Sequence, residues 1–228
     1  MTITKYHKPL LQWLYTVRFS SSKQLATHLH KASQQTIQNK LHILEDQGFI
    51  SKHYDASYKL QGKPAEYFLT PKGARQLPAD STNEWAIKAL YKNKTVSPDF
   101  IAHCLNVADT VLTLQSIYGD KLRIFTKSDM TAYDYFPSWT PDLFLNLKVG
   151  NIRRRYFLDV WDSTQPFFIS VRKTRNYINY AEEGDWPVGE YAMPTVLAVC
   201  QDTKTQQKLS RQIRRALEEK DVTDEITF

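Results

Sequence analysis

The chain has 228 residues, and a hydrophobic content of 42% with 13% aromatic residues is enough for a substantial core. No run of about 18 apolar residues occurs, so we expect no membrane-spanning helix. The apolar stretch near the N-terminus is broken by Gln12 and Arg18 and lacks a cleavage-site pattern, which favours a folded helix over a signal peptide. Cys104 and Cys200 lie far apart in the sequence in apolar surroundings, and we expect free thiols in a cytoplasmic protein.

The positive charge of the chain is concentrated at one end. Residues 1–80 contain 11 Lys and Arg against 5 Asp and Glu, which accounts for the whole net charge of +6, while the rest of the chain has 19 of each. A local basic excess raises the local concentration of polyanions, nucleic acid above all. The distribution therefore indicates nucleic-acid binding by the first third of the chain.

Three helical patterns follow one another in this first third. Apolar residues repeat at helical spacing in the segments "HKPLLQWLYTVRF", "SSKQLATHLH" and "SQQTIQNKLHILEDQGF". Ser21 or Ser22 can cap the second helix, and Gly48 can end the third. The turn between the second and third helices, "HKAS", is short enough for a helix-turn-helix arrangement.

A basic hairpin is predicted after Gly48. Two strand patterns, at about residues 50–54 and 66–69, flank a loop that contains Lys59, Gly62, Lys63 and Pro64. Three helices followed by a basic hairpin predict a winged helix. The closing segment "LTPKGARQL" resembles the ends of many bacterial winged-helix DNA-binding domains, and this resemblance covers about residues 5–78.

The third helix and the hairpin carry the predicted DNA contacts. With Ile37, Leu41 and Leu44 turned inward, the helix presents amide side chains outward near its N-terminal end. Amides can donate and accept at an adenine edge in the major groove, while hydroxyls and lysines reach phosphates. The predicted DNA-binding residues are Ser33, Gln34, Gln35, Thr36, Gln38, Asn39, Lys52, Lys59 and Lys63. The alternatives are a solvated helix face without a ligand and a winged helix that binds protein.

A second domain is predicted after a polar linker at residues 79–97, in which "NEWAIKAL" indicates a connector helix. A long amphipathic helix runs from about Pro98 to Tyr118. Three strands, a helix, a strand and a final helix follow, with Gly150 and Asn151 as a two-residue hairpin turn. The apolar strand in "TVLAVCQ" is expected at the centre of the sheet. This order predicts helices packed around one mixed sheet over residues 98–228.

The second domain resembles a nuclease fold. The element order, with "PD" opening the second strand and an acidic residue late in the third, resembles the core of PD-(D/E)xK nucleases, which are restriction-endonuclease-like enzymes. With the preceding winged helix, the segments "AHCLNVADTVLTL", "PDLFLNL", "YFLDVWDST" and "RNYINY" are similar to the replication-relaxation family of plasmid and mobile-element proteins. The resemblance implies a DNA-binding accessory factor in processing or relaxing plasmid DNA, with a replication or relaxase protein as a further partner. The predicted fold class is α+β, a winged helix (1–78) followed by this nuclease-like domain.

The predicted hairpin brings two carboxylates together. A turn at Gly150 and Asn151 places Asp142 directly opposite Asp159 on one face of the sheet. Two adjacent carboxylates are costly unless a cation or a proton separates them, and hard cations such as Mg²⁺ take oxygen ligands. Asp142 and Asp159 are therefore the candidate metal ligands, and Mg²⁺ is the cofactor that an active site would need.

The lysine of the nuclease motif is missing from its usual position. In the motif it lies two residues after the acidic residue, near the attacking water and the phosphate. Trp161 occupies that position here. The favoured interpretation is a catalytically inactive domain that needs no cofactor. The first alternative is a DNA endonuclease that uses Asp142, Asp159 and a relocated Lys173, and the second is a different α/β fold.

Two basic segments of the second domain are candidates for a second DNA contact. The segment "SVRKTRNYINY" interleaves basic residues with Tyr177 and Tyr180, which is typical of a surface that binds phosphates and stacks bases, or of a helix that packs its tyrosines against a sheet. The segment "RRRYF" is a basic cluster near the hairpin tip. A further hypothesis is a winged-helix transcriptional regulator whose second domain dimerises or senses a ligand. Duplex DNA is the expected partner, a homodimer is compatible with each hypothesis, and no membrane partner is expected.

Overall fold

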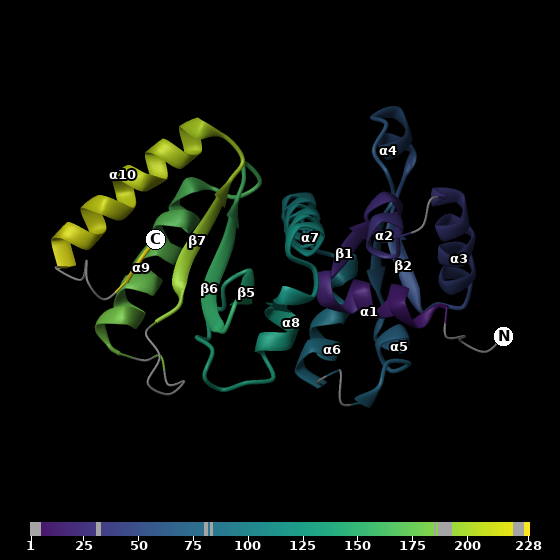
Figure 1. Ribbon diagram of the computed structural model, residues 1–228. Helices are drawn as coiled ribbons and strands as arrows, with labels where there is room; N and C mark the ends of the chain where they lie inside the picture. Colours follow the sequence, from purple (N-terminus) through teal and green to yellow (C-terminus); the bar gives the residue numbers. More distant parts are fainter. Residues whose placement is uncertain are drawn as a thin grey trace. The chain divides into compact units, whose positions relative to one another are not determined.

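The computed structural model describes residues 6–30, 33–79, 82, 84–184, 186, 193–220 and 226–228. The chain forms two compact units, residues 1–113 and 114–228, and Figure 1 labels most of their helices and strands. The dividing point lies inside helix α7 (Pro98–Tyr118). Compactness alone does not define a functional domain, so the predicted boundaries after residues 78 and 97 stay predictions.

The first unit contains several helices and a small antiparallel sheet of three strands. The strands have the order β1-β3-β2. Its elements are α1 (Lys8–Val17), β1 (Phe19–Ser21), α2 (Ser22–His28), α3 (Gln34–Asp46), β2 (Ile50–His53), α4 (Ala56–Leu60), β3 (Glu66–Leu69), α5 (Pro71–Ala74), α6 (Glu84–Leu90), the 3₁₀ helix η2 (Tyr91–Lys94) and the first part of α7. The three predicted helices and the hairpin β2–β3 are confirmed, and β1 and α4 are additions that the sequence did not predict.

Local capping sets the ends of the helices. The Ser21 hydroxyl accepts the backbone N–H of Gln24, and the Gln24 side chain accepts the backbone N–H of Ser21, which is a capping box at the start of α2. At the end of α3, Gly48 has a φ of +70°, which suits a residue without a Cβ atom. The next backbone N–H, of Phe49, donates to the carbonyl of Leu44 at 3.0 Å. Both predicted helix ends are confirmed.

The connector and the start of α7 dock onto this first unit. Arg18 Nε donates to Asn93 Oδ1 at 2.7 Å, and Gln24 Nε2 donates to Asp109 Oδ1 at 2.8 Å. A small apolar cluster completes the contact, and its buried members are Phe19, Phe68, Ile101 and Cys104. By length and hydropathy, the helical segment Pro98–Lys121 could span a membrane. Near the start of this helix, Ile101 and Cys104 pack against Phe19 and Phe68.

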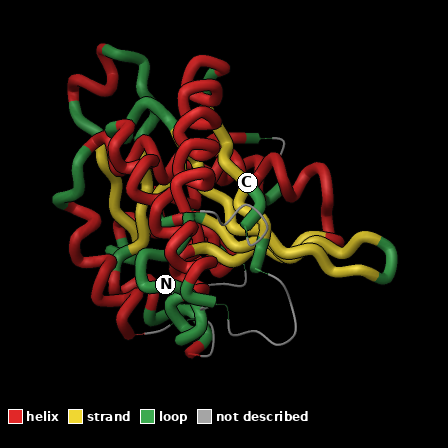
Figure 2. Tube along the Cα trace, turned by 90° about the vertical axis from the view of Figure 1, so that its left-hand side faces the viewer, coloured by secondary structure: helices red, strands yellow, loops and turns green. Residues whose placement is uncertain are grey.

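The second unit is a four-stranded mixed sheet with helices. Its elements are β4 (Leu122–Thr126), α8 (Lys127–Met130), β5 (Leu143–Val149), β6 (Ile152–Trp161), α9 (Phe167–Glu182), β7 (Thr195–Cys200) and α10 (Thr203–Lys220). The strand order is β4-β5-β6-β7, in which only β6 and β7 are parallel. Figure 2 shows the β5–β6 hairpin extending past the rest of this sheet. The α+β fold class with a mixed sheet is confirmed.

The position of β7 corrects one expectation. This apolar strand lies at the edge of the sheet, where it pairs with β6, and not at its centre. An edge strand has a neighbouring strand on one side only, so its apolar side chains need not all be buried. Val199 of β7 is partly exposed. The backbone N–H of Val196 donates to the carbonyl of Thr227 at 2.8 Å, so the end of the chain runs beside this edge. Cys104 and Cys200 are free thiols, as predicted.

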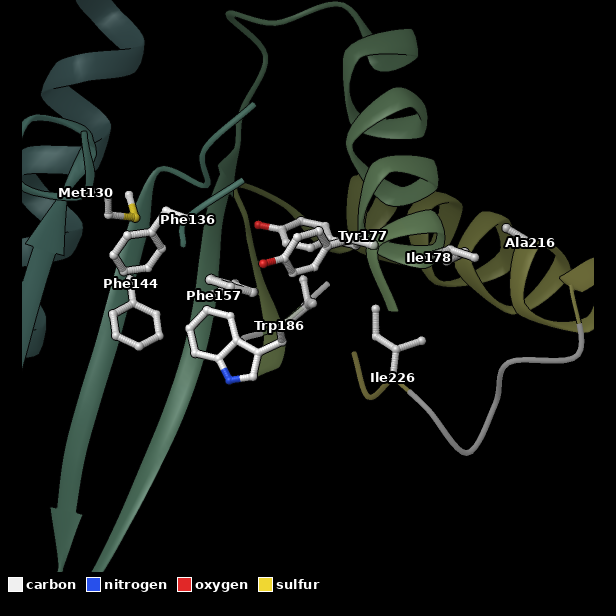
Figure 3. Close-up of a cluster of buried hydrophobic side chains, with 11 residues drawn as sticks. Met130, Phe136, Phe144, Phe157, Tyr177, Ile178, Trp186, Ala216 and Ile226 are labelled. Carbon is white, nitrogen blue, oxygen red and sulfur yellow. The ribbon is translucent and has the colours of Figure 1, made fainter. Parts of the chain in front are cut away.

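Helices α9 and α10 cover one face of the sheet. Phe144 and Phe157 of the central strands face Tyr177 of α9 in Figure 3, and the ring centroids of Phe157 and Tyr177 are 5.8 Å apart. On the same face, Trp161 packs against Leu209 and Ile213 of α10. Asp159 lies between Phe157 and Trp161 in the strand and shares their face, because alternate residues of a strand point to the same side. The carboxylate site is therefore built under these two helices.

Candidate nucleic-acid interface and carboxylate site

Helix α3 separates an apolar face from a polar one. Ile37, Leu41 and Leu44 are completely buried, as the periodicity predicted. The side chains on the opposite face near the start of the helix are exposed. They are Ser33, Gln35, Thr36, Gln38 and Asn39. Gln34 begins the helix, but its side chain lies outside the described residues.

The polar face of α3 consists of amide and hydroxyl groups. Gln35 Nε2 donates to Asn39 Oδ1 at 3.2 Å, one helical turn away, so these two amides lie side by side on the surface. Ser33 is the N-cap residue, yet its hydroxyl makes no capping hydrogen bond. The start of the helix thus presents its positive dipole end beside hydroxyls and amides, a combination that suits a phosphate next to base edges.

The loop between β2 and β3 is ordered by polar contacts. It contains the short helix α4, at the end of the hairpin in Figure 1. The Asp55 carboxylate accepts the backbone N–H of Tyr58, whose hydroxyl donates to Glu66 at 2.8 Å. Burial and the Glu66 carboxylate raise the pKa of Tyr58 to about 12, so the phenol stays protonated. Lys59 and Lys63 are exposed on this loop, and Lys63 Nζ lies 5.9 Å from the Tyr58 ring centroid.

Lys52 has a different environment from the other two hairpin lysines. Its Nζ lies 2.7 Å from Glu45 Oε2, in an ion pair that joins β2 to α3. The hydrogen bond to Glu45 raises the pKa of Lys52. The amino group is therefore engaged inside the unit, and a phosphate contact by Lys52 would compete with Glu45.

The second candidate site lies at the start of β5 and the end of β6. Val149 pairs with Ile152 and Leu143 with Leu158, which is the register that the two-residue turn predicted. The backbone N–H of Asp142 donates to Asp159 Oδ1 at 3.1 Å. In the reverse direction, the backbone N–H of Val160 donates to Asp142 Oδ2 at 3.0 Å. The two carboxylates are side by side, and Asp142 is 3% exposed and Asp159 0%.

Two lysines and a tyrosine complete this site. Lys173 Nζ of α9 contacts Asp159 Oδ1 and lies 3.3 Å from Asp142 Oδ1. Lys127 Nζ of α8 lies 2.9 Å from Asp142 Oδ1, and the Tyr177 hydroxyl donates to Asp159 Oδ2 at 2.7 Å. Each of the four carboxylate oxygens therefore has at least one donor from the protein. We call these five residues the carboxylate cluster.

The sequence predicted three of the five members of the carboxylate cluster and missed two. Tyr177 follows Lys173 by one helical turn and so lies on the same face of α9, a spacing that could have revealed it. Lys127 follows β4 directly, and the pairing of Thr126 with Leu143 brings it next to Asp142. The register of β4 was not predictable from a turn, because a long segment separates β4 from β5.

The electrostatics of the carboxylate cluster are those of an internal ion pair network. Burial raises the pKa of Asp159; the Lys173 charge opposes this effect, and the Asp142 charge adds to it. Burial alone would lower the pKa of Lys173, but the two carboxylates outweigh it, so the pKa is raised. Burial and Asp159 hold the pKa of Tyr177 well above its ordinary value. Lys173 is thus an ammonium, and Tyr177 is a neutral donor.

The carboxylate cluster fits an ammonium better than a metal ion. A divalent cation such as Mg²⁺ would need carboxylate oxygens as ligands. Here each oxygen already accepts from Lys173, Lys127, Tyr177 or a backbone N–H. Within the described ranges, no group of three or more His, Cys, Asp or Glu residues is placed to hold a metal ion.

Trp161 and the tyrosines of α9 belong to the core. Trp161, at the position of the nuclease-motif lysine, is buried against Leu209 and Ile213 of α10. Tyr177 and Tyr180 are also buried. The interpretation of these tyrosines as a base-stacking surface is therefore wrong, because their rings pack against the sheet.

Comparison with known proteins identifies the family. A family model described as replication-relaxation matches residues 11–193, which is most of the chain. The chain belongs to the replication-relaxation family. Membership of this family points to a role in plasmid or mobile-element replication. The replication-relaxation match spans both α3 and the carboxylate cluster. No curated protein and no solved structure matches the chain.

Proposed function

We propose that this member of the replication-relaxation family is a sequence-specific duplex DNA-binding protein, and that it acts as an accessory factor in plasmid or mobile-element replication or relaxation. Its N-terminal unit is a winged helix, and its C-terminal unit is a nuclease-like domain without catalytic activity. The observation that carries the proposal is the exposed row of amides and hydroxyls at the start of α3, which lies over a completely buried apolar stripe.

Each part of the first unit has a role in this proposal. Helix α3 enters the major groove, where the amides of Gln38 and Asn39 contact base edges. Ser33 and Thr36 bind phosphates beside the start of the helix. The hairpin β2–β3 is the wing, and its exposed Lys59 and Lys63 bind the phosphates of the neighbouring backbone. Lys52 pairs with Glu45, so Lys52 can bind a phosphate only in competition with that carboxylate.

The carboxylate cluster supports the non-catalytic assignment of the second unit. Asp159 is fully buried, and the Lys173 side chain is only 14% exposed. A phosphodiester would therefore have to displace the side chains that cover these carboxylates. Lys173 serves as the internal counter-charge of two aspartates, and Trp161 fills the position of the missing lysine with a core side chain.

A second candidate function rests on one specific observation. Lys173 reaches both Asp142 and Asp159, which is the set of residues that a metal-dependent endonuclease with a relocated lysine would use. In that case the carboxylate cluster would have to open to admit a metal ion and a DNA strand. The closed arrangement of donors favours the structural role.

The wing assignment can be tested with lysine substitutions. The variant Lys59→Ala/Lys63→Ala should weaken binding to all duplex sequences similarly, because phosphate contacts carry no sequence information. The slope of log K against log salt should become less negative by about 1 for each lysine. Fluorescence anisotropy across a range of NaCl concentrations measures both. The control Lys88→Ala/Lys92→Ala removes the same charge from exposed positions outside the wing. Equal affinity and slope for the wing variant and the wild type would refute the wing assignment.

A further inference from the structure

The end of the β5–β6 hairpin projects as a two-stranded arm. Strand β4 pairs with β5 only as far as Leu147, and β7 pairs with β6 only from Tyr156 onward. Residues 148–155, which we call the arm, thus lie beyond the neighbouring strands of the sheet, as Figure 2 shows. The arm ends in a tight turn at Gly150, whose φ of +60° suits the first central position of a type II′ turn.

The arm carries a dense positive charge. Its sequence, "KVGNIRRR", contains four basic residues and no acidic one, although residues 81–228 as a whole have no net charge. Lys148 lies directly opposite Arg153 in the ladder, and like charges in directly opposite positions destabilise a hairpin. No Asp or Glu of the described chain forms an ion pair with Lys148, Arg153 or Arg154. An external polyanion would relieve this repulsion.

An apolar pair lies at the tip of the arm. Val149 and Ile152 are cross-strand partners, 47% and 63% exposed, on the face opposite Lys148 and Arg153. Among the described residues, the two side chains belong to no buried cluster, because the neighbouring strands β4 and β7 end before them. Proteins that bind the minor groove often insert apolar side chains as wedges between base steps.

We infer that the arm is a second DNA-binding element that bends the duplex. The lysine and arginines bind the phosphates on the two sides of the minor groove. The minor groove is about 6 Å wide, too narrow for a two-stranded ribbon but wide enough for the tip side chains. Val149 and Ile152 enter it and partly unstack a base step. The inference rests on duplex DNA being the ligand, as proposed above, and extends it from sequence reading by α3 to DNA bending by the second unit.

The charge of the arm can be tested separately from its tip. The variant Arg153→Ala/Arg154→Ala should bind a labelled mixed-sequence duplex about tenfold more weakly at moderate salt, with a salt slope less negative by nearly 2. Its control is Arg211→Ala/Arg214→Ala on α10, which removes the same charge from two exposed arginines and should leave both quantities unchanged. Wild-type affinity and slope for the arm variant would overturn the inference. In that case the partner of the arm would be an acidic protein surface.

The tip can be tested by DNA bending. A duplex labelled at both ends with a donor and an acceptor dye should show increased energy transfer when the wild-type protein binds. The variant Val149→Ser/Ile152→Ser should lose this increase while its Kd changes by less than about threefold. Unchanged energy transfer with the wild-type protein, or the same increase with the variant, would overturn the wedge.

The outcomes for α3 separate this inference from the proposed function. If Gln38→Ala/Asn39→Ala lowers sequence preference while the arm variants behave as the wild type, the inference alone fails. If the arm variants lose affinity while the α3 variant behaves as the wild type, base reading by α3 fails and the arm stands. Absence of all duplex binding would overturn both.

Discussion

Replacing Lys173 by methionine is expected to destabilise the second unit by about 3–5 kcal/mol, because it leaves two buried carboxylates without their shared cation. Lys173 contacts Asp142 and Asp159 in a site where neither carboxylate reaches solvent. Unfolding in urea, followed by the fluorescence of the tryptophans, measures the loss. Methionine is unbranched and one atom shorter than lysine, so the change removes charge with little loss of volume.

The effect should also depend on pH in a defined direction. Burial raises the pKa of Asp159 above its ordinary value of 3.8, and Lys173 opposes this shift. Without Lys173 the pKa of Asp159 rises further. Between pH 3.8 and this raised pKa, Asp159 therefore keeps a proton in the folded variant that it has lost in the unfolded chain. The free energy of unfolding of Lys173→Met should therefore fall as pH rises above 3.8 through the folded pKa. In the wild type, the pKa of Lys173 is raised above 10.5. The stability that the Lys173 charge contributes is therefore fully present below pH 10.5, and it is lost only as pH rises through the folded pKa.

Two controls make this test specific. Lys127 contacts the same Asp142 but is half exposed, so Lys127→Met should cost no more than about 1 kcal/mol. The double variant Asp159→Asn/Lys173→Met removes both charges and should regain most of the lost stability. If Lys173→Met were as stable as Lys127→Met at neutral pH, the carboxylate cluster would not be the structural element described above.

The variant Gln38→Ala/Asn39→Ala is expected to lose most of the sequence preference of the protein. Each amide that contacts a base edge with two hydrogen bonds contributes about 1–3 kcal/mol of discrimination, which corresponds to roughly fivefold to 150-fold. Phosphate contacts remain, so affinity for mixed-sequence DNA should change little. Selection of bound duplexes from a random pool by the wild type defines the preferred site. Competition with mixed-sequence DNA then measures the ratio between the affinities for preferred and for mixed DNA.

A glutamine outside α3 provides the matched control. Gln206 is exposed on α10, and Gln206→Ala should keep the wild-type ratio between preferred and mixed DNA. A ratio that is the same for the α3 variant and for Gln206→Ala would exclude base reading by these amides. The solvated helix face would then be the correct description of α3.

Short-range patterns in the sequence predicted much of the architecture. The apolar repeat of α3 identified Ile37, Leu41 and Leu44, because helical spacing alone decides which residues share a face. The two-residue turn at Gly150 and Asn151 predicted the β5–β6 register, and with it the meeting of Asp142 and Asp159. A tight turn fixes all pairs of its hairpin at once, which makes this kind of contact predictable.

The remaining features depend on contacts between distant segments, or on elements too short to show an apolar repeat. Strand β1 has three residues and α4 has five, so neither shows a repeat. The partners of Lys52 and Lys127 follow from the packing of separate elements. The edge position of β7 follows from strand order, which an apolar composition does not specify. The resemblance to a known family supplied Lys173 as a candidate, and only the packing of α9 on the sheet brings it to both carboxylates.

The most direct test of the account is a titration of supercoiled plasmid that carries the DNA flanking the gene, with and without Mn²⁺, resolved on one gel. A DNA-binding protein without nuclease activity should retard the plasmid at increasing protein concentration, with no nicked or linear product in either series. Metal-dependent nicking by the wild type that is absent in Asp159→Ala, with retardation retained, would contradict the proposed function and identify the carboxylate cluster as a nuclease site.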